Sequence, residues 1–401
     1  MLNAPLEHRY TLFLLLSVNA LSIVAMQFIV PAMPSLVGEY ATTPAMVQLT
    51  LTMFMLGYAA FQIAYGPLSD RFGRKGVLMW ATAVFVVGSF LGMVAPNIEV
   101  LVLARVLQSV GAAAGFVLPP AVSRDVYGHD GAPKAIGWIS ISAGMAALVA
   151  PYLGGLVHET VGWRWGMGLN GVLGIILLIA CGFFLAESHP PALRRAVGIA
   201  GLARGYATLA RSMRFMGYLL SVAFVNGAFY AFFAGGTFVA IDILGLSPSQ
   251  FGLLTIPVVL FFVPSAYVSV RMAERFGTTR IIALGTLVTF AGSAGLLVVA
   301  LAGHASVAAM LVASAMLGWG NGQVIPNATA AGVNLFPKLA GTASASLGTA
   351  QMGMGAVASL LFGLMHNGTP TPMAALMAGM GLAAFVSCAL IVAARRRPAA
   401  A

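Results

Sequence analysis

Charged residues are sparse along this chain and collect in short clusters, with long uncharged and mostly apolar runs between them. Each run has about 20 residues or more, enough to cross a hydrocarbon core of about 30 Å as a helix. Alternation of apolar and polar residues, as in a membrane β-barrel, is absent. The pattern therefore predicts an all-α integral membrane protein with twelve transmembrane helices, at residues 10–33, 46–68, 76–95, 99–122, 135–157, 165–187, 215–241, 249–270, 281–303, 305–328, 339–363 and 370–394.

Composition and charge placement agree with this prediction. Only 7% of the residues are charged, against about 25% in an ordinary soluble domain. The formal net charge of +10 would suit a nucleic-acid partner. If the N-terminus is cytosolic, however, Lys and Arg fall in the cytosolic connections or at the two ends, except for Arg164 outside and Arg105 within a helix. Acidic residues such as Glu39 and Glu159 fall on the opposite face. This is the positive-inside asymmetry, so we expect the basic bias to set orientation and we expect no nucleic-acid partner.

The sequence repeats itself weakly across its two halves. Pro44 and Pro248 open similar segments 204 residues apart, and "DRFG" (70–73) and "ERFG" (274–277) share that offset. "GFVLPPA" (115–121) and "GQVIPNA" (322–328) recur at 207. These matches predict two pseudo-symmetric six-helix halves, 1–187 and 214–401, an architecture of transporters with a site between the halves. The basic segment 188–213, which includes Arg194 and Arg195, is either an amphipathic helix or a solvated linker.

The densest charge cluster is "GPLSDRFGRKGV" (66–77), in the turn between the second and third predicted helices. Its cations would hold the turn in the cytosol. Topology does not explain Asp70, nor the glycines at 66 and 73. We expect Asp70 to make contacts that form in one conformation and break in another, which would bias a two-state equilibrium.

This turn resembles the signature turn of the major facilitator superfamily, and two other segments strengthen the resemblance. "LARVLQSVGAAAG" (103–115) resembles the superfamily's Arg-x-x-Gln-Gly pattern, with Ser109 where Gly is usual. The fifth predicted helix resembles the signature of its exporters, although Ala146 and Ala150 replace two glycines. "SRDVYG" (123–128) and "ILGLSPSQFGLL" (243–254) resemble the bicyclomycin and chloramphenicol resistance branch of the drug:proton antiporters. The matching residues expected to act as a conformational switch are Gly66, Asp70, Arg71, Gly73, Arg74, Gly137, Pro151, Gly154 and Gly155.

The resemblance implies the major facilitator fold and a secondary active exporter of small amphipathic drugs or metabolites. It further implies proton antiport by alternating access, a monomer, and the inner membrane of a bacterium with both termini in the cytosol. The alternative is a metabolite facilitator or importer that is not coupled to protons. An integral membrane enzyme or a channel is disfavoured, because no catalytic cluster, phosphate-binding loop or metal-ligand cluster occurs in the sequence. We therefore expect no enzymatic activity, no cofactor and no metal.

Arg105 is the one unambiguous ionisable residue deep within a predicted helix. Placing Arg at a bilayer centre costs about 2.5–3.5 kcal/mol, so Arg105 needs a partner inside the protein. Related proteins usually carry an acid in the first helix, and Gln27 stands there instead. Either another group carries the proton, with Asp242 the nearest candidate, or the cavity stays positive and favours neutral or anionic substrates.

Other polar and aromatic residues within the predicted helices could line a cavity or could only join helices by hydrogen bonds. The candidates for substrate binding or coupling are Gln27, Tyr58, Gln62, Arg105, Gln108, Asn226, Tyr230, Asp242, Asn321 and Asn327.

Overall fold

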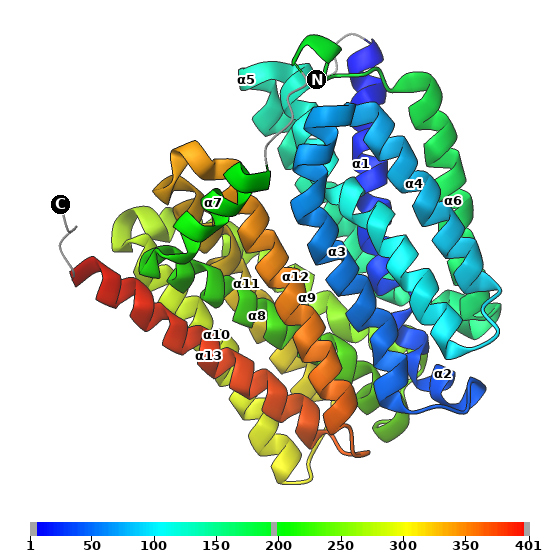
Figure 1. Ribbon diagram of the computed structural model, residues 1–401. Coiled ribbons are helices and arrows are strands. Elements are labelled where there is room, and N and C mark those ends of the chain that lie inside the picture. Colours follow the sequence, from blue (N-terminus) through cyan, green and yellow to red (C-terminus); the bar gives the residue numbers. More distant parts are fainter. Residues whose placement is uncertain (1–5, 194–198, 397–401) are drawn as a thin grey trace. The chain divides into compact units, whose positions relative to one another are not determined.

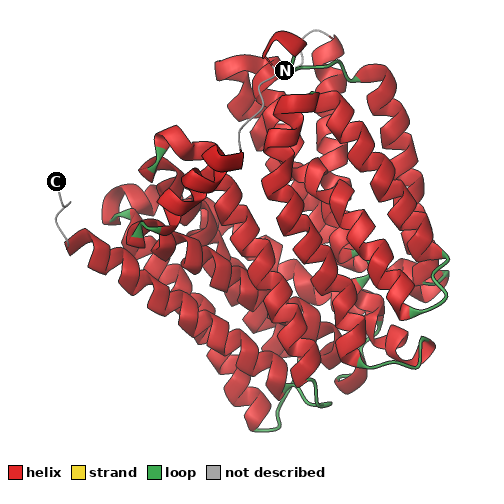
Figure 2. Ribbon diagram, viewed as in Figure 1, coloured by secondary structure: helices red, strands yellow, loops and turns green. Residues whose placement is uncertain are grey.

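The computed structural model describes residues 6–193 and 199–396. Over these residues the chain forms helices and connecting loops, with no strand (Figure 2). The first group of helices comprises α1 (Leu6–Gln27), η1 (Val30–Ala32), α2 (Met33–Glu39), α3 (Pro44–Phe72), α4 (Arg74–Met93), α5 (Ile98–Thr160), α6 (Trp163–Phe184) and η2 (Pro191–Leu193). The second comprises α7 (Ile199–Ala210), α8 (Met213–Phe238), η3 (Val239–Ile243), α9 (Pro248–Phe276), α10 (Thr278–Leu301), α11 (Val307–Leu335), η4 (Pro337–Leu339), α12 (Ala340–Met365) and α13 (Thr371–Arg396).

Twelve of these helical segments within the described residues are long and apolar enough to cross a membrane, which confirms the predicted number. Several are longer than the uncharged runs that predicted them. The run 46–68 lies within a helix from Pro44 to Phe72, and the run 10–33 within a span from Tyr10 to Glu39. An uncharged run marks the part of a helix that lies in hydrocarbon, whereas the helix itself continues into the charged interface.

The chain divides into two compact units. The first contains residues 1–42 and 49–197, and the second contains residues 43–48 and 198–401. Within the first unit, α1 packs on α5, and α4 packs on both α5 and α6 (Figure 1). Within the second, α8 packs on α13 and α12, and α11 packs on α9 and α10.

Two helical segments of the first unit are interrupted, and both breaks matter for the site. The first span bends after Gln27, where α1 gives way to η1 and α2; Pro31 and Pro34 stand at the starts of these short helices. Proline lacks the N–H that a continuing helix needs. Residues 98–160 contain two spans that meet at Gly128, whose φ of 64° and ψ of −167° are not helical.

The basic segment after α6 contains the helix α7, so a helix stands where the sequence left helix and linker open. Leu209 of α7 is buried against Phe215 and Leu347 in the core of the second unit. A Cβ built on Gly205 would lie 3.6 Å from the side chain of Thr342 in α12. Helix α7 therefore belongs to the second unit by packing. Arg194 and Arg195 lie outside the described residues.

The turns between α3 and α4 and between α9 and α10 share one backbone conformation. Gly73 has φ 95° and ψ 151°, and Gly277 has φ 86° and ψ 140°. This region is open almost only to glycine. The sequence repeat "DRFG" and "ERFG" therefore corresponds to a repeated local structure.

Candidate functional site

Arg105 lies in the first half of α5, and its side chain is fully buried. Its Nη1 donates to the carbonyl oxygen of Ala25 at 2.7 Å and to Oε1 of Gln108 at 2.6 Å. Its Nη2 donates to the carbonyl oxygen of Met26 at 3.4 Å. The guanidinium also lies over the ring of Phe54, 4.1 Å from its centroid. The buried cation is thus held by carbonyls, an amide and an aromatic face.

The two backbone carbonyls are available because α1 ends at Gln27. The last carbonyls of a helix have no partner within it and carry the negative end of the helix dipole. Ala25 and Met26 lie in this last turn. Arg105 therefore caps the break in the first span, an arrangement that stabilises a cation without an acid.

No carboxylate pairs with Arg105 among the described residues. Gln27 is buried, and its Oε1 has no hydrogen-bond partner among the residues that the structure describes. The amide of Gln108 extends the cluster by donating to Oγ of Ser89 at 2.8 Å. The structure therefore brings Arg105 and Gln108 together and leaves the Gln27 side chain outside their hydrogen bonds. Nε of Arg105 is also buried, and it has no hydrogen-bond partner among the residues the structure describes.

Gly154 meets the same break from the second half of α5. A Cβ built on Gly154 would lie 2.1 Å from the carbonyl oxygen of Phe28, the residue after α1 ends. Only glycine allows this approach. Gly155 and Pro151 lie close by in the same helix, whereas a Cβ on Gly137 would meet no atom within 4 Å.

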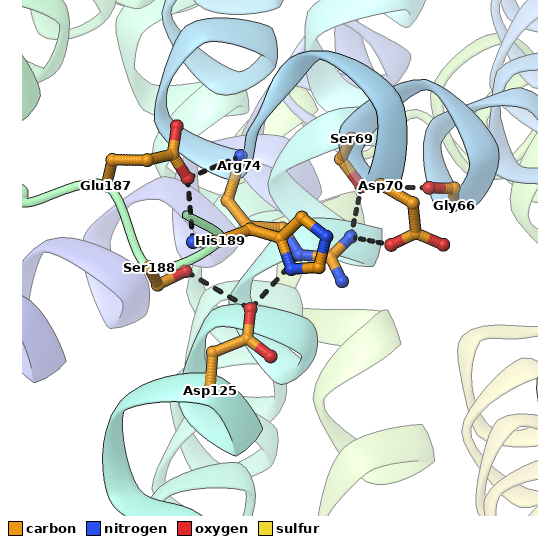
Figure 3. Close-up of polar contacts among 8 residues, drawn as sticks. All are labelled: Gly66, Ser69, Asp70, Arg74, Asp125, Glu187, Ser188 and His189. Atoms are coloured by element: carbon orange, nitrogen blue, oxygen red, sulfur yellow. Dashed lines mark hydrogen bonds and ion pairs between the residues drawn. The ribbon is translucent and has the colours of Figure 1, made fainter. Parts of the chain in front are cut away.

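Arg74 is the centre of the charged turn (Figure 3). Its Nη1 lies 2.6 Å from Oδ1 of Asp70 and also donates to Oγ of Ser69. Its Nε donates to Oδ2 of Asp125 at 3.2 Å. The Arg74 side chain is 11% exposed and that of Asp70 37%, so the arginine is enclosed while the aspartate reaches solvent.

The network extends to residues that sequence reasoning did not single out as site residues. The backbone N–H of Arg74 donates to Oε1 of Glu187 at 2.9 Å, and Oγ of Ser188 donates to Oδ2 of Asp125 at 3.2 Å (Figure 3). Lys75 donates to the carbonyl oxygen of Gly182 at 2.9 Å. The turn after α3 is thereby tied to α5 and to the end of α6. The only sequence signal for Asp125 was its place in "SRDVYG", and Glu187 gave none.

Arg71 and Gly66 lie beside this network and take no ion pair in it. Arg71 is exposed and stacks on Phe72, with 5.1 Å from its guanidinium carbon to the ring centroid. The carbonyl oxygen of Gly66 accepts a hydrogen bond from Oγ of Ser69 at 3.0 Å. Gly73 supplies the turn conformation described above.

The other candidates of the first unit are aromatic or amide groups. Tyr58 is buried, with its ring centroid 6.2 Å from that of Phe54 and 6.1 Å from that of Phe116. Phe54 thus connects Tyr58 to the Arg105 guanidinium. Gln62 is buried, and its Oε1 has no partner in the described chain.

Most candidates of the second unit are asparagines, and two of them donate side-chain hydrogen bonds to a neighbouring helix. Nδ2 of Asn226 donates to the carbonyl oxygen of Gln351 at 2.9 Å, and Nδ2 of Asn327 donates to Oγ of Ser269 at 2.8 Å. Oδ1 of Asn321 is buried with no partner among the residues the structure describes. Tyr230 is buried in an aromatic cluster on α8.

Asp242 lies in η3, a π-helical turn that continues α8. Phe238 precedes it by four residues, and the Phe238 ring lies 5.2 Å from the ring of His366 at the end of α12. Burial lowers the pKa of His366, and the negative charge of Asp242 partly opposes that shift. A carboxyl and an imidazole therefore lie near one another at one end of the second unit.

The family model of the Major Facilitator Superfamily matches residues 15–359. The chain belongs to this superfamily. The chain is also 25% identical over 373 residues to the bicyclomycin resistance protein homolog of Haemophilus influenzae, covering 92% of this chain and 93% of that protein. It is 29% identical over 368 residues to the chloramphenicol resistance protein of Pseudomonas aeruginosa, covering 90% of this chain and 86% of that protein.

Among solved structures, a peptide transporter POT in complex with alafosfalin matches 96% of this chain and 94% of its own, with a TM-score of 0.73 and 16% sequence identity. At that identity the likeness shows the major facilitator fold alone. The fold and the resistance branch expected from the signature motifs are confirmed. The chain is thus a Major Facilitator Superfamily transporter.

Proposed function

We propose that this transporter exports small amphipathic drugs or metabolites in exchange for protons, as a monomer in the inner membrane of a bacterium. The observation that carries export is similarity over nearly the full length to two proteins named for resistance to bicyclomycin and chloramphenicol. Both termini lie in the cytosol in this proposal, because the cationic turn after α3 then obeys the positive-inside rule.

The charged turn acts as the conformational switch. Arg74 ties together α3, α5 and the segment after α6 through Asp70, Asp125 and Glu187. Such charge-assisted hydrogen bonds are stronger than neutral ones. Forming or breaking them therefore shifts the equilibrium between two conformations of the transporter. Asp70 is the half-exposed member of the network, which leaves it able to exchange partners when the cytosolic side opens.

The coupling proton binds at Asp242, with His366 as its neighbour. Asp242 is exposed at the end of a membrane-spanning segment, and an ionisable residue in such a segment marks a proton or substrate path by default. A π-helical turn, found frequently at functional sites, positions this one. Arg105 has no acidic partner in the described chain, so a proton is not held there by the carboxylate usual in related proteins.

The second candidate is a facilitator or importer with no proton exchange. Gln27 in place of an acid and carbonyl ligands around Arg105 favour it. In this case the unneutralised Arg105 makes the cavity positive, and neutral or anionic substrates bind better than cations.

Reconstituted vesicles separate the two candidates. Counterflow of a labelled amphenicol, with no ion gradient, identifies a carrier. An imposed pH gradient then accelerates uphill transport only in an antiporter. The proposal requires that acceleration in the wild type and its loss in Asp242→Asn with counterflow retained. Equal rates with and without the gradient in the wild type would exclude antiport and leave the facilitator.

A further inference from the structure

A groove lies in the first unit between the last turn of α3 and the first turns of α4. Its volume is about 310 Å³, and its lining residues are Leu68, Phe72, Gly76, Val77 and Trp80. The walls are apolar. None of these five residues belongs to the Arg105 cluster or makes an ion pair with Arg74.

Glycine opens this groove. Gly76 is exposed, and a Cβ on it would meet no atom within 4 Å, so the space beside this lining residue is open rather than filled by a helix contact. The Phe72 and Trp80 side chains at its two sides are 56% and 54% exposed. A hollow with exposed aromatic walls suits a hydrocarbon chain, and Trp is enriched where lipid headgroups meet the membrane core.

A cation without an acidic partner stands at the rim. Arg71 is exposed and stacks on Phe72, and among the described residues it makes no ion pair. Arg74 is by contrast engaged with Asp70 and Asp125, and Lys75 is turned toward the Gly182 carbonyl. The donors of Arg71 are therefore available to an oxyanion, and a planar guanidinium binds phosphate with two parallel hydrogen bonds.

The repeat in the second unit provides an internal comparison. Arg275 stacks on Phe276 at 5.5 Å, as Arg71 does on Phe72. At the same offset of 204, however, Arg280 stands in place of Gly76 and Leu284 in place of Trp80. The cation is repeated, and the glycine that opens the groove is not.

We propose that this groove binds one acyl chain of an anionic phospholipid, whose headgroup phosphate pairs with Arg71. The proposal needs only the membrane location of α3 and α4. It does not depend on substrate, on transport direction or on proton coupling, so the vesicle assay above can fail without affecting it.

The test uses the full-length protein in bilayers that contain trace phosphatidylglycerol or phosphatidylcholine with the same photoactivatable acyl chain. Peptic fragments that cover residues 64–82 are then analysed for lipid adducts. One cation near the membrane surface adds about fivefold to the binding of an anionic lipid. We therefore expect about fivefold more adduct from phosphatidylglycerol in the wild type.

Three variants locate the effect. Arg71→Gln should reduce the preference to that of the neutral lipid, and Gly76→Leu should lower adducts from both lipids because its side chain fills the groove. Arg275→Gln is the matched control and should leave the preference unchanged. Thermal unfolding confirms that each variant is folded.

Several results would overturn the proposal. Equal labelling by the two lipids in the wild type excludes recognition of the headgroup. Loss of the preference in Arg275→Gln to the same extent as in Arg71→Gln shows that general surface charge is responsible. Absence of adducts from either lipid shows that protein covers the groove, and displacement by free glycerol phosphate shows that the acyl chain is not needed.

Discussion

The turn that joins α3 to α4 and the turn that joins α9 to α10 can be compared residue by residue, because a sequence offset of 204 relates them. Each ends with a glycine in the same conformation, and each glycine N–H bonds a carbonyl four residues back, at 3.0 Å for Gly73 and 2.9 Å for Gly277. Each also places an arginine over the following phenylalanine.

Their charges differ. Thr278 stands where Arg74 organises the first turn, and Glu274, the counterpart of Asp70, makes no ion pair in the described part of the chain. Asp125, the second carboxylate on Arg74, corresponds to Gly332 at the offset of 207. A local backbone conformation can therefore be kept by one glycine, whereas a charge network needs residues contributed by several helices.

Arg105 gives the largest expected contrast between the units, because α11, which repeats part of the α5 sequence, has no charged residue. Arg105→Ala should reduce transport on the order of a hundredfold, since the two shortest of its charge-assisted hydrogen bonds, to Ala25 and Gln108, are lost at about 1.5 kcal/mol each. Arg105→Lys should recover little, because one ammonium cannot reproduce the planar donor set. Vesicle uptake measures both.

Arg271→Ala is the control for this prediction, because Arg271 is exposed and stacks on the exposed ring of Tyr267. Its transport should stay within twofold of the wild type, an estimate for a surface change. Substantial activity in Arg105→Lys would show that charge alone suffices.

Asp70→Asn tests the charged turn directly. Losing one charge-assisted contact to Arg74 should lower transport about tenfold, while insertion and folding stay intact. Glu274→Gln is the matched change in the second unit, and we expect it to have little effect because Glu274 makes no ion pair with any residue the structure describes. Measurement of uptake at equal protein level decides the point, and equal losses in both variants would contradict the assignment of the switch to the first unit.

Gln27→Asp places an acid where the first unit lacks one. If the unneutralised Arg105 makes the cavity positive, the new carboxylate should shift preference toward cations by about five- to tenfold. Binding of a lipophilic cation, a neutral amphenicol and an organic anion is compared in wild type, Gln27→Asp and Gln27→Ala. A wild type that already binds the cation best, with no change in Gln27→Asp, would remove the positive-cavity interpretation.

Gly73→Ala and Gly277→Ala should show the smallest difference between the two units. Both glycines have a positive φ that an alanine adopts only with strain of about 1–3 kcal/mol. We expect similar falls in thermal stability for the two variants. Only Gly73→Ala should also reduce transport per folded molecule, since it alone displaces Arg74.

Much of this fold could be predicted from the sequence, because the length of each uncharged run matches the thickness of the hydrocarbon core that a helix must cross. The contact between Asp70 and Arg74 was also within reach, since the two opposite charges stand only four residues apart in one short turn. The groups that hold Arg105 could not be predicted from the sequence. They are backbone carbonyls, and any residue type supplies a carbonyl, so only the position where α1 ends makes those of Ala25 and Met26 available. The contact of Glu187 could not be predicted for a related reason, because a loop brings Glu187 to Arg74 from far along the chain.

The packing of helix α7 decides where the chain can be divided into two fragments. Leu209 is buried among residues of the second unit, so a cut placed after residue 211 would strip that unit of part of its core. A cut between Phe184 and Ile199 keeps α7 with the partners that bury it. Chimeras and split fragments of this transporter should therefore be joined before α7, so that the second fragment keeps the helix whose Leu209 completes its core.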